Sequence, residues 1–206
     1  MTDFVQYTLP KEVFLEETVV KKSRFIAYAT CIKNADQAKD FVAGIKKKHF
    51  DATHNCYAYV IKDTMKFFDD GEPNGTAGKP ILNAIISKNL IDTVIVVTRY
   101  FGGVKLGAGG LSRAYGNAAL NVIGIIPLVK LSNCIDLEII APYTFSDIII
   151  SVIKKFNFRY QSFYEADVTF KVITTAEKCQ QIISAVLDAT NGKVSIKEGQ
   201  PYIGEI

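Results

Sequence analysis

The apolar pattern from about residue 134 onward constrains the fold more than any other feature of this chain. Two stretches repeat apolar residues at helical spacing, and four shorter stretches are typical of strands. In chain order the expected elements are strand 135–140, helix 145–156, strands 158–164 and 168–173, helix 179–187 and strand 194–197. This order is the split βαβ arrangement. We therefore predict a ferredoxin-like domain over residues 134–206.

The preceding residues predict a second α+β domain, over residues 1–130. The expected strands span 13–20, 25–31, 56–61, 66–69 and 93–98, and the expected helices span 34–48, 81–86 and 111–122. Asn34 can cap the first of these helices, with Gln37 three residues later. Pro127 and the pair Ser132–Asn133 interrupt the apolar pattern, so we expect the domain boundary between residues 127 and 134.

Composition indicates a chain that buries sizeable cores and does not cross a membrane. Of the 206 residues, 49% are hydrophobic, and no apolar run approaches the roughly 20 residues of a membrane span. The N-terminal residues lack the pattern of a secretory signal, so we expect a cytoplasmic location. The four cysteines are widely spaced without a Cys-x-x-Cys pair, which indicates reduced, mostly buried thiols.

Eight of the 14 glycines fall between residues 71 and 110, in two loops that each precede an expected helix. Ordering glycine costs backbone entropy, so this density indicates backbone that turns sharply or approaches something closely. Unpaired amides at the two helix N-termini would suit an anionic group such as phosphate. The glycines expected at this anion site are Gly75, Gly78, Gly102, Gly103, Gly107, Gly109 and Gly110. The alternative is that the glycines only permit close packing between the loops.

Positive charge is concentrated in the same part of the chain. Residues 1–133 contain 17 Lys and Arg against 12 Asp and Glu, whereas residues 134–206 contain 7 against 9. The cations expected to bind the anion are Lys79, Arg99, Lys105 and Arg113. The aromatic residues that could stack on bases are Tyr100, Phe101 and Tyr115, which could alternatively belong to the core.

Neither common nucleotide-binding motif is present. The segment before Lys79 resembles a P-loop, but Pro73 occupies the position of its first glycine and Pro80 that of its metal-binding Ser or Thr. The dinucleotide fingerprint fails because Ser112 stands where its third glycine is required. We therefore expect no cofactor.

Asp69, Asp70 and Glu72 place three carboxylates within four residues, which could hold Mg²⁺ together with a substrate phosphate. Before Pro-Asn-Gly the same residue types are also ordinary turn and capping residues. His54 and Cys56 share one strand face and permit a Cys–His pair, but no third orienting group is evident. We expect no catalytic residue and no metal. The alternative is an enzyme that acts on a phosphorylated small molecule, with a metal held by these carboxylates.

The same motifs resemble a known family. The matching segments are 23–26, 54–58, 69–73, 75–82, 99–103, 105–107, 109–111 and 114–116. In these segments the chain is similar to the bacterial YigZ proteins and the eukaryotic IMPACT proteins.

The resemblance implies an N-terminal domain of the ribosomal-protein superfamily, like the fourth domain of elongation factor G. It implies a C-terminal domain like the last, ferredoxin-like domain of that factor. Eukaryotic relatives affect translation by opposing activation of the amino-acid-starvation kinase through an added recognition domain, which we expect this chain to lack. We therefore expect a translation-related regulator that binds RNA or the ribosome through its basic glycine loops, with a protein partner as a further possibility.

Overall fold

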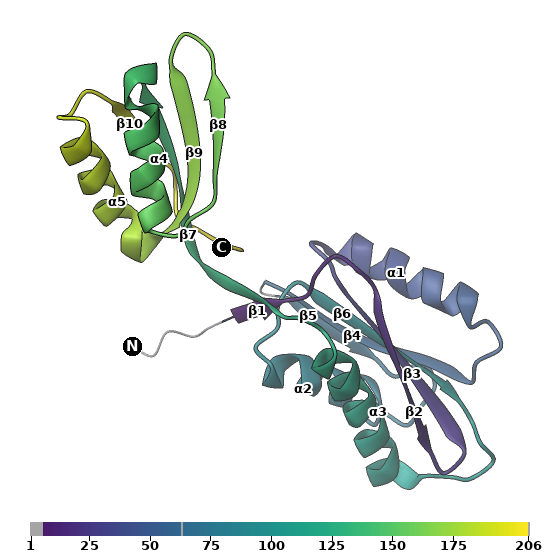
Figure 1. Cartoon of the computed structure of the whole chain (residues 1–206). Coiled ribbons are helices and arrows are strands. Elements are labelled where there is room, and N and C mark those ends of the chain that lie inside the picture. The colour runs from purple at the N-terminus through teal and green to yellow at the C-terminus, as the bar shows by residue number, and fades with distance from the viewer. Residues whose placement is uncertain (1–5, 63, 206) are drawn as a thin grey trace. The chain divides into compact units, whose positions relative to one another are not determined.

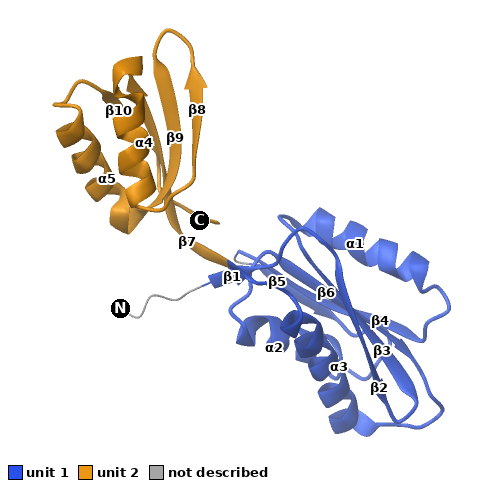
Figure 2. Cartoon of the chain, in the orientation of Figure 1, with its two compact units in different colours: residues 1–129 blue, residues 130–206 orange. Residues whose placement is uncertain are grey.

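The computed structural model describes residues 6–62 and 64–205, so residues 1–5, 63 and 206 of the two predicted domains lie outside the described part. The chain divides into two compact units, residues 1–129 (unit 1) and 130–206 (unit 2), coloured separately in Figure 2. The described residues form a mixed α+β fold with two antiparallel sheets and five α-helices (Figure 1), which confirms the predicted fold class. None of these helices is long and apolar enough to cross a membrane.

Unit 1 is built on a five-stranded antiparallel sheet with helices on both faces. In sheet order the strands are β2 (Phe14–Val20), β3 (Ser23–Cys31), β6 (Thr93–Tyr100), β4 (His54–Ile61) and β5 (Thr64–Phe68). The helices are α1 (Ala35–Lys48), α2 (Gly78–Ser87) and α3 (Gly107–Gly124), and a short strand β1 (Gln6–Thr8) precedes them.

The alternation of side chains across this sheet produces two core layers. On one face, Val42 and Ile45 of α1 pack in a cluster with Tyr28. On the other face, residues of α2 and α3, among them Ile81 and Tyr115, pack in a second cluster with sheet residues. Residues 93–99 of β6 are buried throughout, as the run of β-branched residues there predicts.

Unit 2 has the predicted strand-helix-strand-strand-helix-strand order. Its elements are β7 (Val129–Ala141), a 3₁₀ turn (Tyr143–Phe145), α4 (Ser146–Lys155), β8 (Tyr160–Tyr164), β9 (Val168–Thr175), α5 (Ala176–Ala189) and β10 (Ser195–Glu198). In the sheet order β10-β7-β9-β8, the first and third strands of the motif (β7 and β9) are central, and the fourth and second (β10 and β8) are at the edges. This is the ferredoxin-like arrangement. An additional strand, β11 (Tyr202–Glu205), which was not predicted, also pairs with β7.

Three of the element boundaries that differ from the prediction bear on the glycine loops and on the boundary between the units. Ser132 and Asn133 lie inside β7 because β11 pairs with this segment, with Ile203 opposite Asn133 and Gly204 opposite Ser132. The helices α2 and α3 begin at Gly78 and Gly107, before the predicted starts. Some of the glycines expected in loops therefore lie in the first turns of helices.

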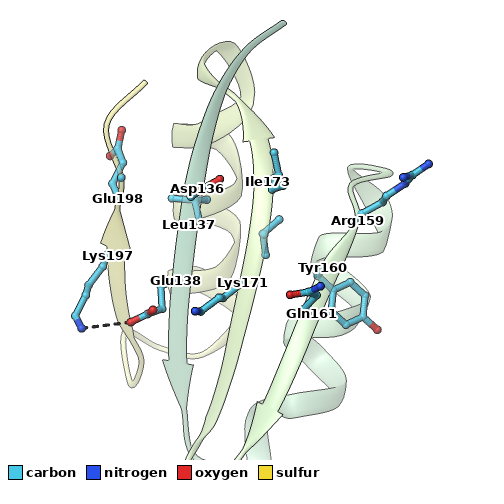
Figure 3. A pocket seen from close by; sticks show the side chains of 12 residues that line it. Asp136, Leu137, Glu138, Arg159, Tyr160, Gln161, Lys171, Ile173, Lys197 and Glu198 are labelled. Atoms are coloured by element: carbon cyan, nitrogen blue, oxygen red, sulfur yellow. Dashed lines mark hydrogen bonds and ion pairs between the residues drawn. The ribbon is translucent and has the colours of Figure 1, made fainter. Parts of the chain in front are cut away.

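A hollow of about 580 Å³ lies on the sheet of unit 2 and is shown in Figure 3. Its lining carries three cationic and three anionic side chains, and Lys197 pairs with Glu138 at 3.3 Å. Tyr202 donates a hydrogen bond to Asp136 at 2.7 Å. The charges of this hollow are balanced, so it does not attract an anion as a basic surface would.

Gly102 sits where the chain of unit 1 allows no side chain. A Cβ atom at this position would overlap the carbonyl group of Lys22, and the Gly102 amide donates to Ser23 Oγ at 3.1 Å. We expect Gly102→Ala to lower the free energy of unfolding by about 2–3 kcal/mol, because backbone must move to relieve the overlap. Urea denaturation measures this change.

Gly44→Ala is the matched control, since Gly44 lies in α1 with no atom within 4 Å of the added Cβ. It should raise the free energy of unfolding by about 0.5–1 kcal/mol through helix propensity. Equal effects of the two substitutions would contradict the close packing at Gly102.

Candidate nucleic-acid interface

The glycine-rich segments meet at one end of the sheet of unit 1. Arg99 near the end of β6 lies opposite His54 at the start of β4, and Tyr100 lies opposite Arg24 at the start of β3. The turn 21–22 and the loops 49–53, 69–77 and 101–106 therefore emerge together. We call these four segments the loop end of unit 1.

The N-terminus of α2 is already occupied by a carboxylate of the chain. Asp69 Oδ1 accepts from the amides of Ala77 and Gly78 at 3.0 and 2.8 Å, and its Oδ2 accepts from Gly75 N at 2.9 Å. A carboxylate here satisfies the same orphan amides and helix dipole that a phosphate would. Gly75 and Gly78 therefore bind Asp69 in this structure, and the part of the expected anion site at the N-terminus of α2 is filled by the chain itself.

The other two metal candidates are also engaged by protein donors. Asp70 accepts from Asn55 N at 2.7 Å and pairs with Lys46 Nζ at 2.7 Å. Glu72 accepts from Arg99 and from Tyr115. Within residues 6–62 and 64–205, no three His, Cys, Asp or Glu side chains form a group that could hold a metal ion. The three carboxylates thus act as turn, capping and pairing residues, the alternative that their sequence context left open.

Arg99 differs from the exposed cation that we expected. It is only 5% exposed, and its Nη1 donates to Glu72 Oε1 at 2.6 Å. Its Nη2 lies 3.4 Å from Ser23 Oγ, and its guanidinium lies over the ring of Phe101. Because a buried cation is stable only when paired and hydrogen-bonded, the charge of Arg99 serves this internal pair.

His54 and Cys56 do not form a catalytic pair. His54 Nδ1 donates to the carbonyl of Asp70 at 2.8 Å, and the thiol of Cys56 donates to the carbonyl of Asp69 at 2.9 Å. Burial raises the pKa of Cys56 far above its ordinary value, so the thiol stays protonated. The four cysteines are unpaired; Cys31 is half-buried and the other three are buried, as predicted.

The three predicted stacking residues have different environments. Tyr115 is fully buried, with its ring edge-on to Phe25 at 5.1 Å, and burial raises its pKa. Tyr100 is half-buried, and its hydroxyl donates to Asp51 at 3.0 Å. Phe101 is 45% exposed. Phe101 alone among them offers a largely open ring to a base.

Most of the glycines predicted at the anion site are explained by backbone conformation or by close packing against backbone. A Cβ at Gly78 would lie 2.7 Å from the amide nitrogen of Phe68, so this glycine, like Gly102, permits close packing. Positive φ angles, which favour glycine, occur at Gly75, Gly103 and Gly107. Gly109 and Gly110 lie in the first turn of α3, and Gly109 is exposed. The packing alternative therefore accounts for the two glycines whose added Cβ would overlap backbone, Gly78 and Gly102.

The N-terminus of α3 remains open. Leu106 at its N-cap gives no side-chain hydrogen bond, and no acidic residue occupies the first turn. A Cβ on Gly109 would lie 3.6 Å from Nη1 of Arg113, so this guanidinium lies beside the first turn. Arg113 and Pro80 also line one shallow hollow between α2 and α3.

Three exposed cations lie on α2, on α3 and in the loop before α3: Lys79 in the first turn of α2, Lys105 two residues before α3, and Arg113 in the second turn of α3. Among the described residues, no carboxylate forms an ion pair with any of the three. Their charges and the free amides of α3 form the candidate interface, which suits phosphate oxygens.

No motif of the sequence identifies His49, which joins the start of the loop 49–53 to the sheet through hydrogen bonds to Tyr28 of β3 and Tyr100 of β6. The hydroxyl of Tyr100 donates to Asp51, so it accepts from His49 Nδ1 at 2.9 Å; Tyr28 then donates to His49 Nε2 at 2.7 Å. The buried ring is thus neutral and satisfied, and burial lowers its pKa below the ordinary value.

Comparison with known proteins assigns the family. Residues 21–123 match the Impact N-terminal domain. The IMPACT family member YvyE of Bacillus subtilis is 40% identical over 201 residues, which cover 94% of this chain and 91% of YvyE. The chain belongs to the IMPACT family.

Other IMPACT relatives match over shorter segments. The family member YigZ of Escherichia coli is 43% identical over 102 residues, 47% of this chain and 50% of YigZ. Rat protein IMPACT is 33% identical over 109 residues, and the match covers 34% of the rat protein. A crystal structure of a hypothetical protein, 29% identical, is similar over 93% of this chain and 96% of its own, with a TM-score of 0.60.

The lowered pKa of His49 predicts a pH-dependent stability. Below about pH 6.5 this histidine is protonated in the unfolded chain, whereas in the folded protein its lowered pKa keeps it neutral to a lower pH. The free energy of unfolding therefore falls as the pH falls. We expect His49→Gln to cost about 1–2 kcal/mol at pH 8 through its altered hydrogen bonds, and to lose this part of the pH dependence. Urea denaturation between pH 8 and pH 5 measures both. A variant with the wild-type slope over this range would contradict the assignment.

Proposed function

We propose that this IMPACT-family chain is a translation-related regulatory protein of the cytoplasm that binds RNA or the ribosome through unit 1. One observation carries the proposal: three cations are exposed without a carboxylate partner among the described residues, Lys105 and Arg113 close to the uncapped N-terminus of α3 and Lys79 in the first turn of the adjacent helix α2. The translation-related part rests on the family, whose eukaryotic members the sequence motifs resemble.

The electrostatics of the loop end favour a polyanion. Its carboxylates Asp51, Asp69, Asp70 and Glu72 all accept hydrogen bonds from the chain, and Asp70 and Glu72 are also paired with Lys46 and Arg99, which reduces their opposition to the exposed cations. RNA phosphates would neutralise these cations and accept from the amides of α3, contacts that give affinity without reading sequence.

A small phosphorylated substrate fits the same surface less well. The carboxylates that a metal-dependent enzyme would need are engaged within the protein. Lys79 lies on α2, Lys105 in the loop 101–106 and Arg113 on α3, and the hollow between the two helices is shallow and open. Cations spread over a surface match an extended backbone better than one enclosed phosphate.

The test is the triple variant Lys79→Gln, Lys105→Gln, Arg113→Gln, with binding of a labelled 20-nucleotide RNA followed by fluorescence anisotropy between 50 and 200 mM salt. We expect at least tenfold weaker binding at low salt, and a slope of log affinity against log salt smaller by about 2, since three phosphate contacts are lost.

The control, Lys154→Gln, Lys155→Gln, Lys193→Gln, removes the same charge from exposed positions of unit 2 and should leave the salt slope unchanged. RNA affinity that is equal in the two triple variants would contradict the proposed interface. A thermal shift with Mg²⁺ and a nucleotide that disappears in Asp70→Asn would favour the enzyme instead, and nuclease-resistant capture of one protein would favour a protein partner.

A further inference from the structure

Two exposed phenylalanines lie on adjacent loops of the loop end. Phe50, in the loop 49–53, is 86% exposed, and Phe101, in the loop 101–106, is 45% exposed. The two loops are joined by hydrogen bonds, because Thr53 N donates to Arg99 O at 2.9 Å and Phe101 N donates to Thr53 Oγ1 at 3.0 Å. Val104, 42% exposed, lies three residues after Phe101 in the second loop, and we call Phe50, Phe101 and Val104 together the apolar patch.

The patch is bordered by cations without carboxylate partners. Lys21 and Lys22 form the turn 21–22, Lys47 lies in the last turn of α1, three residues before Phe50, and Lys105 follows Val104; all four are exposed. In the part of the chain that the structure describes, none of these lysines forms an ion pair. The one carboxylate of the loop 49–53, Asp51, accepts a hydrogen bond from Tyr100.

The turn Lys21–Lys22 has a backbone conformation that is unfavourable for lysine. Lys21 and Lys22 have φ angles of 45° and 68° in a two-residue connection between β2 and β3, a geometry that Asn-Gly adopts with less strain. Gly102 packs against the backbone of Lys22, so the strained turn is also locked to the loop 101–106. Such strain is characteristic of residues held in place for binding.

We propose that this patch binds unpaired RNA bases, which stack on Phe50 and Phe101 while Lys21, Lys22, Lys47 and Lys105 contact the flanking phosphates. Bases inside a duplex have no free faces, so exposed rings add nothing to duplex binding, whereas they stack on the bases of a single strand. Arg99 lies over the ring of Phe101 at 5.4 Å and supports it from within the protein. The proposal rests on the proposed function and adds single-stranded RNA as the preferred ligand.

The experiment compares a 12-nucleotide oligouridylate with a 12-base-pair RNA duplex in anisotropy titrations. We expect Phe50→Ser and Phe101→Ser each to weaken oligouridylate binding about tenfold and to leave duplex binding unchanged. Phe163→Ser, at a phenylalanine that is 46% exposed in unit 2, is the matched control and should bind like the wild type. Far-ultraviolet circular dichroism checks that each variant is folded.

The substitution Phe50→Trp gives a direct readout, because the chain contains no tryptophan. This variant should keep its affinity, and its fluorescence should be quenched when oligouridylate stacks on the indole ring. The double variant Lys21→Asn, Lys22→Gly should raise the midpoint of thermal unfolding and weaken oligouridylate binding.

The outcomes separate this inference from the proposed function. Serine variants that bind oligouridylate like the wild type, while the Lys79, Lys105 and Arg113 variant loses RNA binding, would overturn the stacking patch and leave the function standing. A wild-type protein that binds neither oligouridylate nor the RNA duplex would overturn both the stacking patch and the proposed RNA binding. Fluorescence of the Phe50→Trp variant that responds to phosphatidylserine vesicles and not to oligouridylate would show a membrane surface and overturn the inference.

Discussion

The buried ion pair between Glu72 and Arg99 holds the loop end of unit 1 together. Removing two charges from water is costly, so such a pair is stable only when further hydrogen bonds satisfy it. Tyr115 donates to the same carboxylate oxygen at 2.8 Å, and Ser23 lies beside the guanidinium. One interaction therefore links the loop 69–77 to β6, α3 and β3, and the positions of the outer loops depend on it.

The family motifs divide into an interior and a surface part. Asp69, Glu72, Arg99 and Tyr115 bond with one another or with nearby amides and shape the loops from inside. Lys79, Lys105 and the ring of Phe101 are exposed to solvent on that framework, and so is Arg113, which lies between two of the motif segments. A rigid set of loops that displays cations at fixed positions has less ordering entropy to lose on binding an RNA backbone.

Periodicity predicted the elements well because their apolar faces are local features of the sequence. The cap of α1 at Asn34 and the buried strand β6 are examples, and so is the order of elements in unit 2. The early start of α2 does not follow from local pattern, because its capping carboxylate, Asp69, lies nine residues before Gly78. The sequence predicts an exposed Arg99 because its partner, Glu72, is 27 positions away and pairs with it only in the fold. The exposure of Lys79, Lys105 and Arg113 was easier to predict, since a cation is normally exposed unless a distant partner buries it.

We propose that Arg99 stabilises the loop end of unit 1 from within the protein, whereas Lys105 contacts RNA at its surface. Measuring both the free energy of unfolding and the RNA affinity of Arg99→Gln and Lys105→Gln tests it most directly. Arg99→Gln should lose about 3–5 kcal/mol of stability, because Glu72 remains buried without its partner, whereas Lys105→Gln should stay within about 0.5 kcal/mol of wild type and bind RNA more weakly. The reverse pattern, a stable Arg99→Gln protein with weakened RNA binding and a Lys105→Gln protein with normal binding, would contradict the account.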